Sequence, residues 1–505
     1  MANHPLFDKL LAALQEANDL GNIAHILEWD GRTNRPPDAE EYRTGLAGRT
    51  GKKAHAAFIA DEVGAAIEAC LGIIGELTPY QQLQVSRLKA SYDRAKALPS
   101  EFVGRKKATT EAAIATWVKA RKLGDYGMFK PHLAEVLAVM REEAELHGGE
   151  PGNADSLYDQ LLGGFEPGMT TAQARAILDQ VKGWQARFMQ RILQSTVKPN
   201  AALLTGCFPK GRQRRLVEAI VRALGYDFAR GNLSETTHPF MATISSGDHR
   251  ITTRYYENDL RAALFGTPHE AGHAMYEQGA PAEMWPVDNA CLFLSLGIHE
   301  SQSRMYENLV CRSKPFWEYW FRHLQMSFPG FYGSTVGEFY LAINAVKPSP
   351  IRVEADEATY NGHILARFIT ELALLSGDLS VDDAPDFFNE QVLQFVGYRP
   401  ATPAEGILQD VHFPSGYFGY FPTYTFGNLA SGQLFAAFAI AHPDWEDQFR
   451  QGNFSALLEW LRKNVHATGH FESMDNVLTR ATGEGLNPKY WEQYMEEKYF
   501  PLYHV

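Results

Sequence analysis

The length, composition and charge of the chain exclude several classes of protein before any motif is considered. With 505 residues, of which 45% are hydrophobic and 21% charged, the chain has the composition of a folded protein that can bury a large core. Its formal net charge of −13 argues against binding to nucleic acid or to an anionic membrane, because those partners require a basic surface. No apolar run approaches the roughly 20 residues that span a bilayer, so no membrane partner is expected.

Two further features favour a cytoplasmic location. The N-terminal residues lack the basic segment followed by a long apolar segment that is typical of a secretory signal. Cys70, Cys207, Cys291 and Cys311 lie far apart in the sequence and form no C-x-x-C pair. This spacing favours reduced thiols over metal ligands or disulfides.

The first 230 residues are predicted to form one helix after another. Apolar residues recur there at intervals of three and four, in sequence rich in Ala, Leu, Lys and Glu. Ser100 and Thr171 stand where helix N-caps are expected. We expect helices over residues 6–29, 54–71, 79–98 and 101–123.

A short segment near the middle of the chain predicts a β-hairpin. Residues 240–245 and 249–255 are typical of strands, and the turn Ser246-Gly247-Asp248 joins them. A further strand is predicted over residues 351–354, directly after two prolines. Because both stretches lie close in sequence to helices that carry motifs, we expect a small sheet beneath a cleft. From residue 356 to residue 497 the chain is again predicted to be helical.

The most informative feature is the pattern H-E-x-x-H at His269-Glu270-Ala271-Gly272-His273. On a helix, His269 and His273 lie four residues apart on one face and can bind a single metal ion. Glu270 lies beside that ion, where its carboxylate can take a proton from a bound water molecule. This arrangement is typical of zinc metallopeptidases.

Pro268 leaves two possibilities for the helix that carries this motif. Proline is unfavourable inside a helix, so a helix over about residues 259–277 would kink there. Alternatively, the helix begins at Pro268 with Thr267 as its N-cap. In that case Thr267 and Glu270 would form a capping box, which is the structural alternative to a catalytic role for Glu270.

A third protein ligand must come from another segment. The metzincin extension of the motif is absent, and Glu277 lies eight residues from His269, roughly 12 Å along a helix. The best candidate is Glu300, on a predicted helix over residues 292–308 that could return antiparallel to the first. His299 is the rival ligand, although its side chain points about 100° away from Glu300 on an ideal helix.

Several segments together resemble the M32 family of zinc carboxypeptidases, the carboxypeptidase Taq type. Their order and spacing match the family over residues 238–433, and H-E-S-Q-S is far more specific than H-E-x-x-H alone. The matching segments are 238–240 (HPF), 248–255 (DHRITTRY), 269–279 (HEAGHAMYEQG), 299–303 (HESQS), 351–357 (IRVEADE), 406–412 (GILQDVH) and 419–424 (GYFPTY).

The resemblance implies a fold, an activity and an assembly. The fold is mainly α, a multi-helix peptidase fold around a deep substrate groove with a small β-sheet near the active site, related to neurolysin-like and angiotensin-converting-enzyme-like peptidases. The whole chain would form one peptidase unit, with a helical N-terminal part (1–235), a region of catalytic motifs (236–433) and a helical C-terminal part (434–505). The activity is release of single residues from the free C-termini of peptides with broad specificity, by a homodimer.

The resemblance also implies roles for individual residues in catalysis. His269, His273 and Glu300 become the ligands of Zn²⁺, although a site with such ligands can also take Co²⁺ or Mn²⁺. Glu270 becomes the general base, and Tyr424 a donor of a hydrogen bond to the tetrahedral oxyanion.

Further positions are assigned to substrate binding and to support of the metal. Arg352 becomes the residue that binds the terminal carboxylate, because its guanidinium group can bind a carboxylate with two hydrogen bonds. His238 and His412 would help in the cleft. Asp356 and Glu357 would be hydrogen-bond partners that orient the zinc histidines, or else ordinary acids at a helix N-terminus.

Two positions depart from the family's pattern, and two other functions stay open. Phe413 stands where tryptophan is usual, and Pro268 where a hydrophobic residue is usual; both would affect the substrate range more than the reaction. The nearest alternative function is an endo-acting oligopeptidase with the same metal ligands. The other is a catalytically silent peptide-binding protein, against which the complete set of His269, Glu270, His273 and Glu300 argues.

Overall fold

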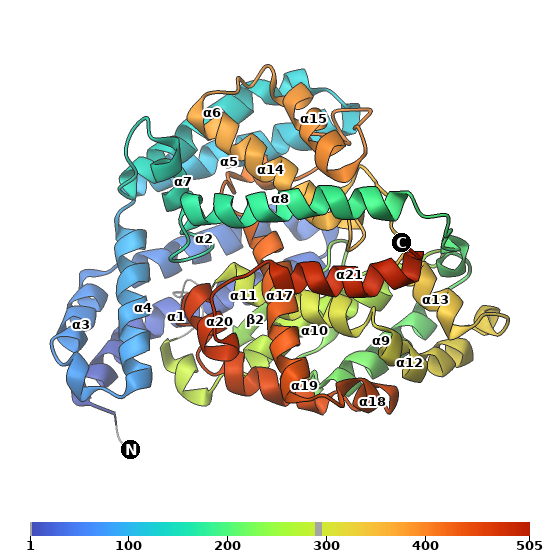
Figure 1. Ribbon diagram of the computed structural model, residues 1–505. Coiled ribbons are helices and arrows are strands. Elements are labelled where there is room, and N and C mark those ends of the chain that lie inside the picture. Colours follow the sequence, from blue (N-terminus) through green and yellow to red (C-terminus); the bar gives the residue numbers. More distant parts are fainter. Residues whose placement is uncertain (1–2, 288–294) are drawn as a thin grey trace.

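The computed structural model describes residues 3–287 and 295–505, and these are mostly helical with one small sheet (Figure 1). The predicted mainly α fold is confirmed, with 69% of the residues in helices. In this described part of the chain, no helix is long and apolar enough to cross a bilayer. Cys70, Cys207 and Cys311 are free thiols, whereas Cys291 lies outside the described residues.

The N-terminal helices pack around a hydrophobic core of their own. The predicted helix over residues 54–71 is wrong as a single element, because the chain becomes extended at Ala60 and a new helix begins at Asp61. Two acids in the first turn of that new helix, Asp61 and Glu62, favour an N-terminus there. The four helices are α1 (Pro5–Thr33), α2 (Glu40–Phe58), α3 (Asp61–Leu71) and α4 (Pro79–Lys96).

The N-caps of two of the next helices lie one residue before the predicted ones. Pro99, not Ser100, occupies the N-cap position of α5. Thr170, not Thr171, caps α8 and forms a capping box with Gln173, because the hydroxyl of Thr171 donates to the carbonyl of Asp155 instead. The helices of this region are α5 (Ser100–Leu123), α6 (Tyr126–Leu146), α7 (Ala154–Leu162), α8 (Thr171–Leu193) and α9 (Lys210–Leu224).

A three-stranded sheet follows, in the order β1 (Leu233–Glu235), β3 (Asp248–Thr253), β2 (Met241–Ser245). The predicted hairpin is confirmed as the antiparallel pair β2 and β3, whereas the parallel strand β1 was not predicted. Helix α1 lies beside this sheet, with the rings of Trp29 and Phe240 5.5 Å apart.

The predicted strand over residues 351–354 is wrong, because the segment forms a short 3₁₀ turn, Arg352–Glu354. The amide groups of Glu354 and Ala355 donate to carbonyls three residues back, and the amide of Arg352 donates to the side chain of Gln409. These backbone groups therefore have no capacity left for a neighbouring strand.

The C-terminal half is again helical and ends with the long helix α21. Helices α8 and α21 run side by side (Figure 1), where Trp184 donates a hydrogen bond of 2.8 Å to Glu496. The helices are α10 (Arg261–Gln278), α11 (Leu296–Arg304), α12 (Lys314–Ser327), α13 (Val336–Ile343), α14 (Tyr360–Ser376), α15 (Ala384–Val396), α16 (His412–Ser415), α17 (Pro422–Ala441), α18 (Trp445–Arg450), α19 (Ser455–Leu461), α20 (Met474–Thr482) and α21 (Lys489–Tyr503).

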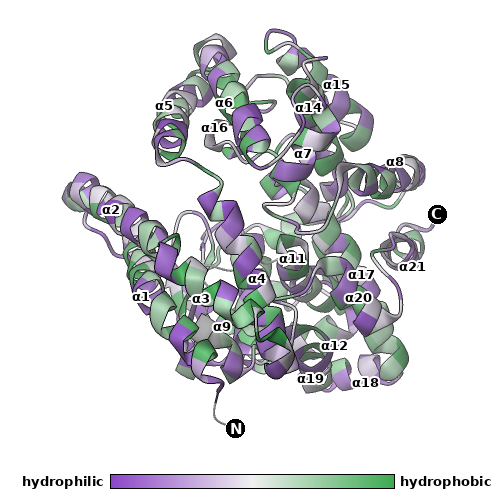
Figure 2. Ribbon diagram, turned by 90° about the vertical axis from the view of Figure 1, so that its left-hand side faces the viewer, coloured by the Kyte–Doolittle hydropathy of each residue, from purple (hydrophilic) through white to green (hydrophobic). Residues whose placement is uncertain are grey.

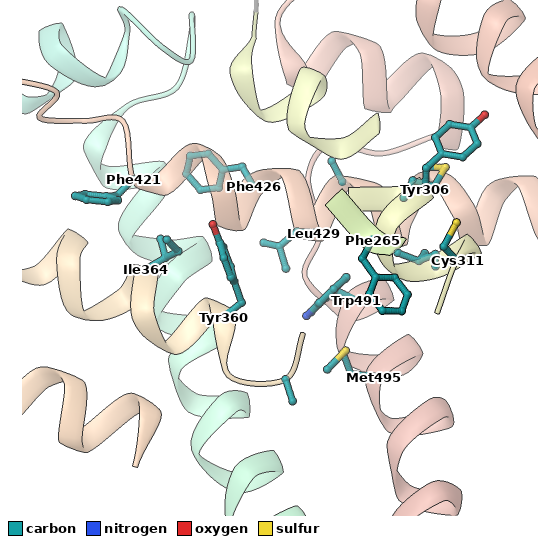
Figure 3. Close-up of a cluster of buried hydrophobic side chains, with 14 of the residues drawn as sticks. Phe265, Tyr306, Cys311, Tyr360, Ile364, Phe421, Phe426, Leu429, Trp491 and Met495 are labelled. Atoms are coloured by element: carbon teal, nitrogen blue, oxygen red, sulfur yellow. The ribbon is translucent and has the colours of Figure 1, made fainter. Parts of the chain in front are cut away.

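One large hydrophobic core joins these later helices, and most helices carry both hydrophilic and hydrophobic residues (Figure 2). Figure 3 shows part of this core, where Phe265 from α10, Leu429 from α17 and Trp491 from α21 lie together. The helices that bear the motifs thus pack against the last helix of the chain. Burial of each such side chain stabilises the folded state by about 1.5–3 kcal/mol.

Candidate active site

Helix α10 carries the H-E-x-x-H motif in its interior. The helix begins at Arg261, well before Pro268, so the prediction that it starts at Pro268 is wrong. The hydroxyl of Thr267 is not free to cap the helix, because it donates to the carbonyl of Ala263 and lies 2.8 Å from the hydroxyl of Thr253 on β3. Glu270 therefore has no capping role, and strand β3 of the sheet packs against this helix.

Three side chains on two helices converge as predicted. The candidate ligand atoms of His269, His273 and Glu300 all lie within 4.8 Å of one another. Oε2 of Glu300 is 3.4 Å from Nε2 of His273 and 3.8 Å from Nε2 of His269. Glu300 comes from α11, which packs against α10, and is 7% exposed. Two imidazole nitrogens and one carboxylate oxygen form a donor set that fits a divalent metal ion.

Glycine makes this close approach possible. A Cβ atom at Gly272 on α10 would lie 2.6 Å from the carbonyl oxygen of Gln302 on α11. A Cβ atom at Gly427 on α17 would lie 2.6 Å from Cγ of Glu300. Helix α11 is therefore held between two helices that each present a glycine to it. Gly427 lies just beyond the motif 419–424, and sequence reasoning did not identify its role.

Glu307 supports His269. Its Oε2 lies 2.8 Å from Nδ1 of His269, and it also pairs with the guanidinium groups of Arg304 and Arg312. Burial alone would raise the pKa of Glu307, but Arg304 and the hydrogen bond to His269 lower it to about 2. Glu307 lies on a π-helical turn, Met305–Val310, that continues α11, and such turns are frequent at functional sites.

The structure gives Asp356 and Glu357 other partners than His269 and His273. Asp356 accepts from the amides of Lys347 and Thr359, and Thr359 is the residue that precedes α14, so the helix N-terminal interpretation fits Asp356. The carboxylate of Glu357 binds side chains of the C-terminal helix, namely Tyr494, Lys498 and Tyr499. The carboxylate that contacts a candidate metal ligand is Glu307 instead, a residue on the same helical face as Glu300.

His299, the rival ligand, lies behind His273 rather than beside it. Its Nδ1 is 2.5 Å from Nδ1 of His273, on the side of that ring away from Glu300. Its Nε2 is 2.9 Å from Oε1 of Glu277. The geometry therefore favours Glu300 over His299 as the third ligand.

Glu270 lies between the two histidines on α10 and is buried. Burial raises the pKa of Glu270 to about 7, against the opposing effect of His269. A carboxylate with a pKa near neutrality can both accept and release a proton, as a general base requires.

A second group of buried charges surrounds Arg352 and is called here the arginine cluster (Arg352, Arg367 and Asp410). Arg352 is 5% exposed, and its Nε and Nη2 atoms donate to Oδ1 of Asp410. The other oxygen of Asp410 accepts from Arg367 at 2.7 Å. Two guanidinium groups thus share one carboxylate, and the cluster keeps one unbalanced positive charge.

Tyr360 joins the arginine cluster to the metal ligands. Its hydroxyl accepts from Nη1 of Arg352 at 2.8 Å, and its ring lies 4.0 Å from the guanidinium of Arg304. Arg304 in turn donates to Oε1 of Glu300 at 2.7 Å. Only one tyrosine side chain (labelled in Figure 3) therefore separates the arginine cluster from the ion pair that holds Glu300.

Tyr424 and His412 lie beside Arg352. The guanidinium of Arg352 is 4.8 Å from the ring of Tyr424, and Nε2 of His412 is 3.3 Å from the Tyr424 hydroxyl. Burial lowers the pKa of His412 to about 3, so this imidazole is neutral. Burial and the nearby Glu300 raise the pKa of Tyr420 to about 12. Sequence reasoning missed Tyr420, although it stands in the same motif as Tyr424.

Two predicted residues are placed differently. His238 is exposed in the loop between β1 and β2, and within the described residues no hydrogen bond or ion pair links it to His269, His273 or Glu300. Phe413 packs in the core against Phe418 and Phe421, with ring centres 5.5 and 6.0 Å away. The departure at Phe413 therefore concerns core packing rather than the wall of a groove.

A buried helix with H-E-x-x-H, completed by a glutamate from a neighbouring helix, defines a helical metallopeptidase. The family model described as "Carboxypeptidase Taq (M32) metallopeptidase" matches residues 9–499. The chain belongs to this family, which confirms the resemblance seen in the sequence, and the protein is a metal-dependent carboxypeptidase.

Individual relatives match over the whole chain. Thermostable carboxypeptidase 1 of Thermus thermophilus is 37% identical and carboxypeptidase 1 of Bacillus subtilis 34% identical, each over 100% of both chains. The crystal structure of an M32 carboxypeptidase from Deinococcus radiodurans superposes with a TM-score of 0.94 at 34% identity, covering 99% of this chain and 100% of that one. These relatives therefore show both the family and the fold of the chain.

Proposed function

We propose that the protein removes single residues from the free C-termini of peptides with broad specificity, at a Zn²⁺ site formed by His269, His273 and Glu300. The observation that carries this proposal is the short connection, through Tyr360, between a cation-binding group of ligands and the positively charged arginine cluster. Hydrolysis at the last peptide bond requires a terminal carboxylate to be bound close to the metal. An endopeptidase has no need of a buried positive charge at that place.

The arginine cluster supports the proposed choice of substrate. Asp410 occupies the Nε side of the Arg352 guanidinium and Tyr360 accepts from Nη1, so one N–H of Nη1 and one of Nη2 are left for another acceptor. A substrate carboxylate would accept these hydrogen bonds and would also neutralise the unbalanced charge. In the proposed complex, Arg352 therefore fixes the last residue of the peptide.

The remaining side chains suggest how the reaction proceeds. When bound, a divalent metal ion supplies a Lewis acid that polarises the scissile carbonyl and lowers the pKa of water. Glu270 accepts the proton of the attacking water and passes it to the leaving amine. Tyr424 donates its hydroxyl hydrogen to the developing oxyanion, while Nε2–H of the neutral His412 donates to the Tyr424 oxygen and orients it.

We further propose one peptidase unit over residues 1–505, a cytoplasmic location and a homodimer. The free thiols of Cys70, Cys207 and Cys311 support a reducing compartment, and the family resemblance supports the substrate groove and the homodimer. The donor set also accepts Co²⁺ or Mn²⁺, so metal analysis of the purified protein tests the choice of zinc. Light scattering tests the dimer.

The test of the function uses one peptide in two forms, with a free C-terminal carboxylate and with a C-terminal amide. A mass-spectrometric time course should show a ladder of single-residue losses from the free acid alone. Internal cleavage of both forms would replace the proposal by an oligopeptidase. If the zinc-loaded protein cleaved neither, the silent peptide-binding function would be favoured.

A further inference from the structure

A row of polar side chains leads from the half-buried His273 and His299 into the protein interior, away from the other candidate metal ligands. His273 and His299 approach through their Nδ1 atoms, 2.5 Å apart, and His299 reaches Oε1 of Glu277 at 2.9 Å. The second oxygen of Glu277 lies 3.2 Å from Nε2 of His470. Glu277 is 2% and His470 0% exposed, so this row runs through the protein interior. The proposed reaction uses neither His299 nor Glu277.

The hydrogens in this row have one consistent arrangement. Nε2 of His273 faces Glu300 and would bind the metal, so the hydrogen of this ring is on Nδ1. That hydrogen is donated to Nδ1 of His299, which must then carry its own hydrogen on Nε2. Nε2–H of His299 is donated to the carboxylate of Glu277. Each atom of the row thus has a defined role as donor or acceptor.

The two zinc histidines are supported in different ways. His269 contacts a carboxylate directly, since Glu307 lies 2.8 Å from its Nδ1. Nδ1 of His273 instead contacts the neutral imidazole of His299, and the carboxylate of Glu277 lies on the far side of that ring. A hydrogen bond from Nδ1–H to an acceptor fixes the ring of a ligand histidine and raises its basicity.

We propose that His299 and Glu277, named here the Glu277 relay, are positioning residues that hold His273 in the orientation and tautomer needed for metal binding. Glu277 acts on His273 through the His299 ring, as Glu307 acts directly on His269. This inference rests on the proposed metal site.

Two further contacts support the relay. His470 and His299 hold the pKa of Glu277 well below its usual range, although burial alone would raise it, so the charge that polarises His299 is present. The ring of Tyr276 stacks on His470 at 4.2 Å and meets His299 edge to face at 5.3 Å. Both imidazoles are thereby held in place around the carboxylate.

A purely structural role makes a different prediction from a positioning role. If the row only stabilised the core, its loss would lower the melting temperature and leave the metal affinity of the folded protein unchanged. If it positions His273, its loss weakens metal binding even where the fold is intact. Zinc affinity and the melting temperature of the metal-free protein therefore separate the two.

The experiment compares Glu277→Gln, His299→Leu and His299→Asn with the wild type and with the control His466→Leu. His466 is as buried as Glu277, lies beside Tyr276 and bonds Gln302 on α11, but is outside the relay. Zinc affinity is measured by competition with a chromogenic chelator, and the metal-free melting temperature by calorimetry. Glu277→Gln keeps the shape of the side chain, and His299→Asn keeps an oxygen that can accept from His273.

We expect zinc affinity to fall about 10–100-fold in Glu277→Gln and His299→Leu. His299→Asn should fall between these and the wild type, and His466→Leu should bind zinc as the wild type does. Zinc affinities of the relay variants within twofold of that of His466→Leu would overturn the relay but leave the metal site standing. A wild-type protein that bound no zinc would overturn both.

If the variants fail to fold, the relay can still be tested in the wild-type protein. Nitrogen-15 NMR of the histidine-labelled, zinc-loaded wild type reports which nitrogen of each ring carries the hydrogen. A hydrogen on Nε2 of His299 and on Nδ1 of His273 is the expected result. The opposite tautomer of His299 would overturn the relay without any substitution.

Discussion

The two buried groups of charges at the active site are unbalanced in opposite directions. Around the candidate metal ligands, the carboxylates of Glu300 and Glu307 pair with the guanidinium groups of Arg304 and Arg312, and the buried Glu270 adds a third carboxyl group that pairs with neither arginine. In the arginine cluster, two guanidinium groups face one carboxylate. Unbalanced charge is costly to bury. This difference supports the proposal that each group binds a ligand of the opposite charge, a metal cation on one side and a substrate carboxylate on the other.

The largest loss of activity is expected when one carboxylate beside the candidate metal ligands is removed and the three candidate ligands are kept. Glu270→Gln should lower kcat by about 10²–10⁴-fold, because an amide cannot accept the proton of the attacking water. Zinc content should stay stoichiometric, since Glu270 is not a proposed ligand. Steady-state kinetics and metal analysis of the same preparation check both. Activity close to that of the wild type would remove Glu270 from the reaction.

The arginine cluster is tested by a change that keeps the charge and removes the planar fork. Arg352→Lys should lower kcat/KM for a free-acid peptide by about 10–100-fold, mainly through KM, since a hydrogen bond to a charged group contributes about 1.5–3 kcal/mol. The exposed Arg399→Lys is the matched control and should change nothing measurable. A fall in kcat with KM unchanged would mean that Arg352 maintains the fold of the site rather than binding the carboxylate.

The approach of the two helices that carry the metal ligands can be tested with two glycines of α10. A Cβ atom at Gly272 would meet the backbone of Gln302 and Ser303 at 2.6 and 2.7 Å, whereas one at Gly266 would meet nothing within 4 Å. Gly272→Ala should therefore cost about 1–3 kcal/mol of unfolding free energy and weaken zinc binding. Gly266→Ala should be neutral or stabilise by up to about 1 kcal/mol. Denaturant unfolding measures the unfolding free energy of both variants. Equal changes in the two variants would contradict the close approach of α11 at Gly272.

The part of the site that could be predicted from the sequence follows from spacing along one helix. His269, Glu270 and His273 needed only the helical period, and Glu300 and Arg352 needed the longer motifs. What could not be predicted depends on contacts between distant segments. Nothing in the sequence around Asp356 and Glu357 distinguishes support of the metal from their bonds to residue 359 and to α21.

The same limit explains the errors in the fold. The helical regions and the β-hairpin follow from local periodicity, which the chain carries clearly. The turn at residues 352–354 resembles a strand in sequence because Ile and Val alternate there. In the structure, however, the amide of Arg352 donates to the side chain of Gln409, more than 50 residues away, and is not available to a neighbouring strand. Likewise, the need for glycine at position 427 is seen only in the packing of α17 against Glu300.

The smallest expected effect on activity concerns a buried carboxyl group outside both charge groups. Glu371 accepts from the hydroxyl of Tyr158 and the amide of Gly419, and burial raises the pKa of this carboxyl to about 8. Between about pH 4.5 and 8, the unfolded chain releases a proton that the folded protein retains. The stability of the folded state therefore falls as the pH rises through this range, by at most about 1.4 kcal/mol per pH unit from this group.

Glu371→Gln should remove this contribution and flatten the dependence of stability on pH, with activity unchanged. The amide keeps an oxygen that can accept from Tyr158 and Gly419. Denaturant unfolding at several pH values between 5 and 8, with zinc in excess, compares the slope with that of the wild type. Tyr158→Phe is the matched variant, because it removes a hydrogen bond that lowers the pKa of Glu371 and keeps the carboxyl group, so its slope should persist. Parallel curves for Glu371→Gln and the wild type would mean that Glu371 is ionised in the fold, and that its charge offsets the unbalanced positive charge of the arginine cluster through Arg367.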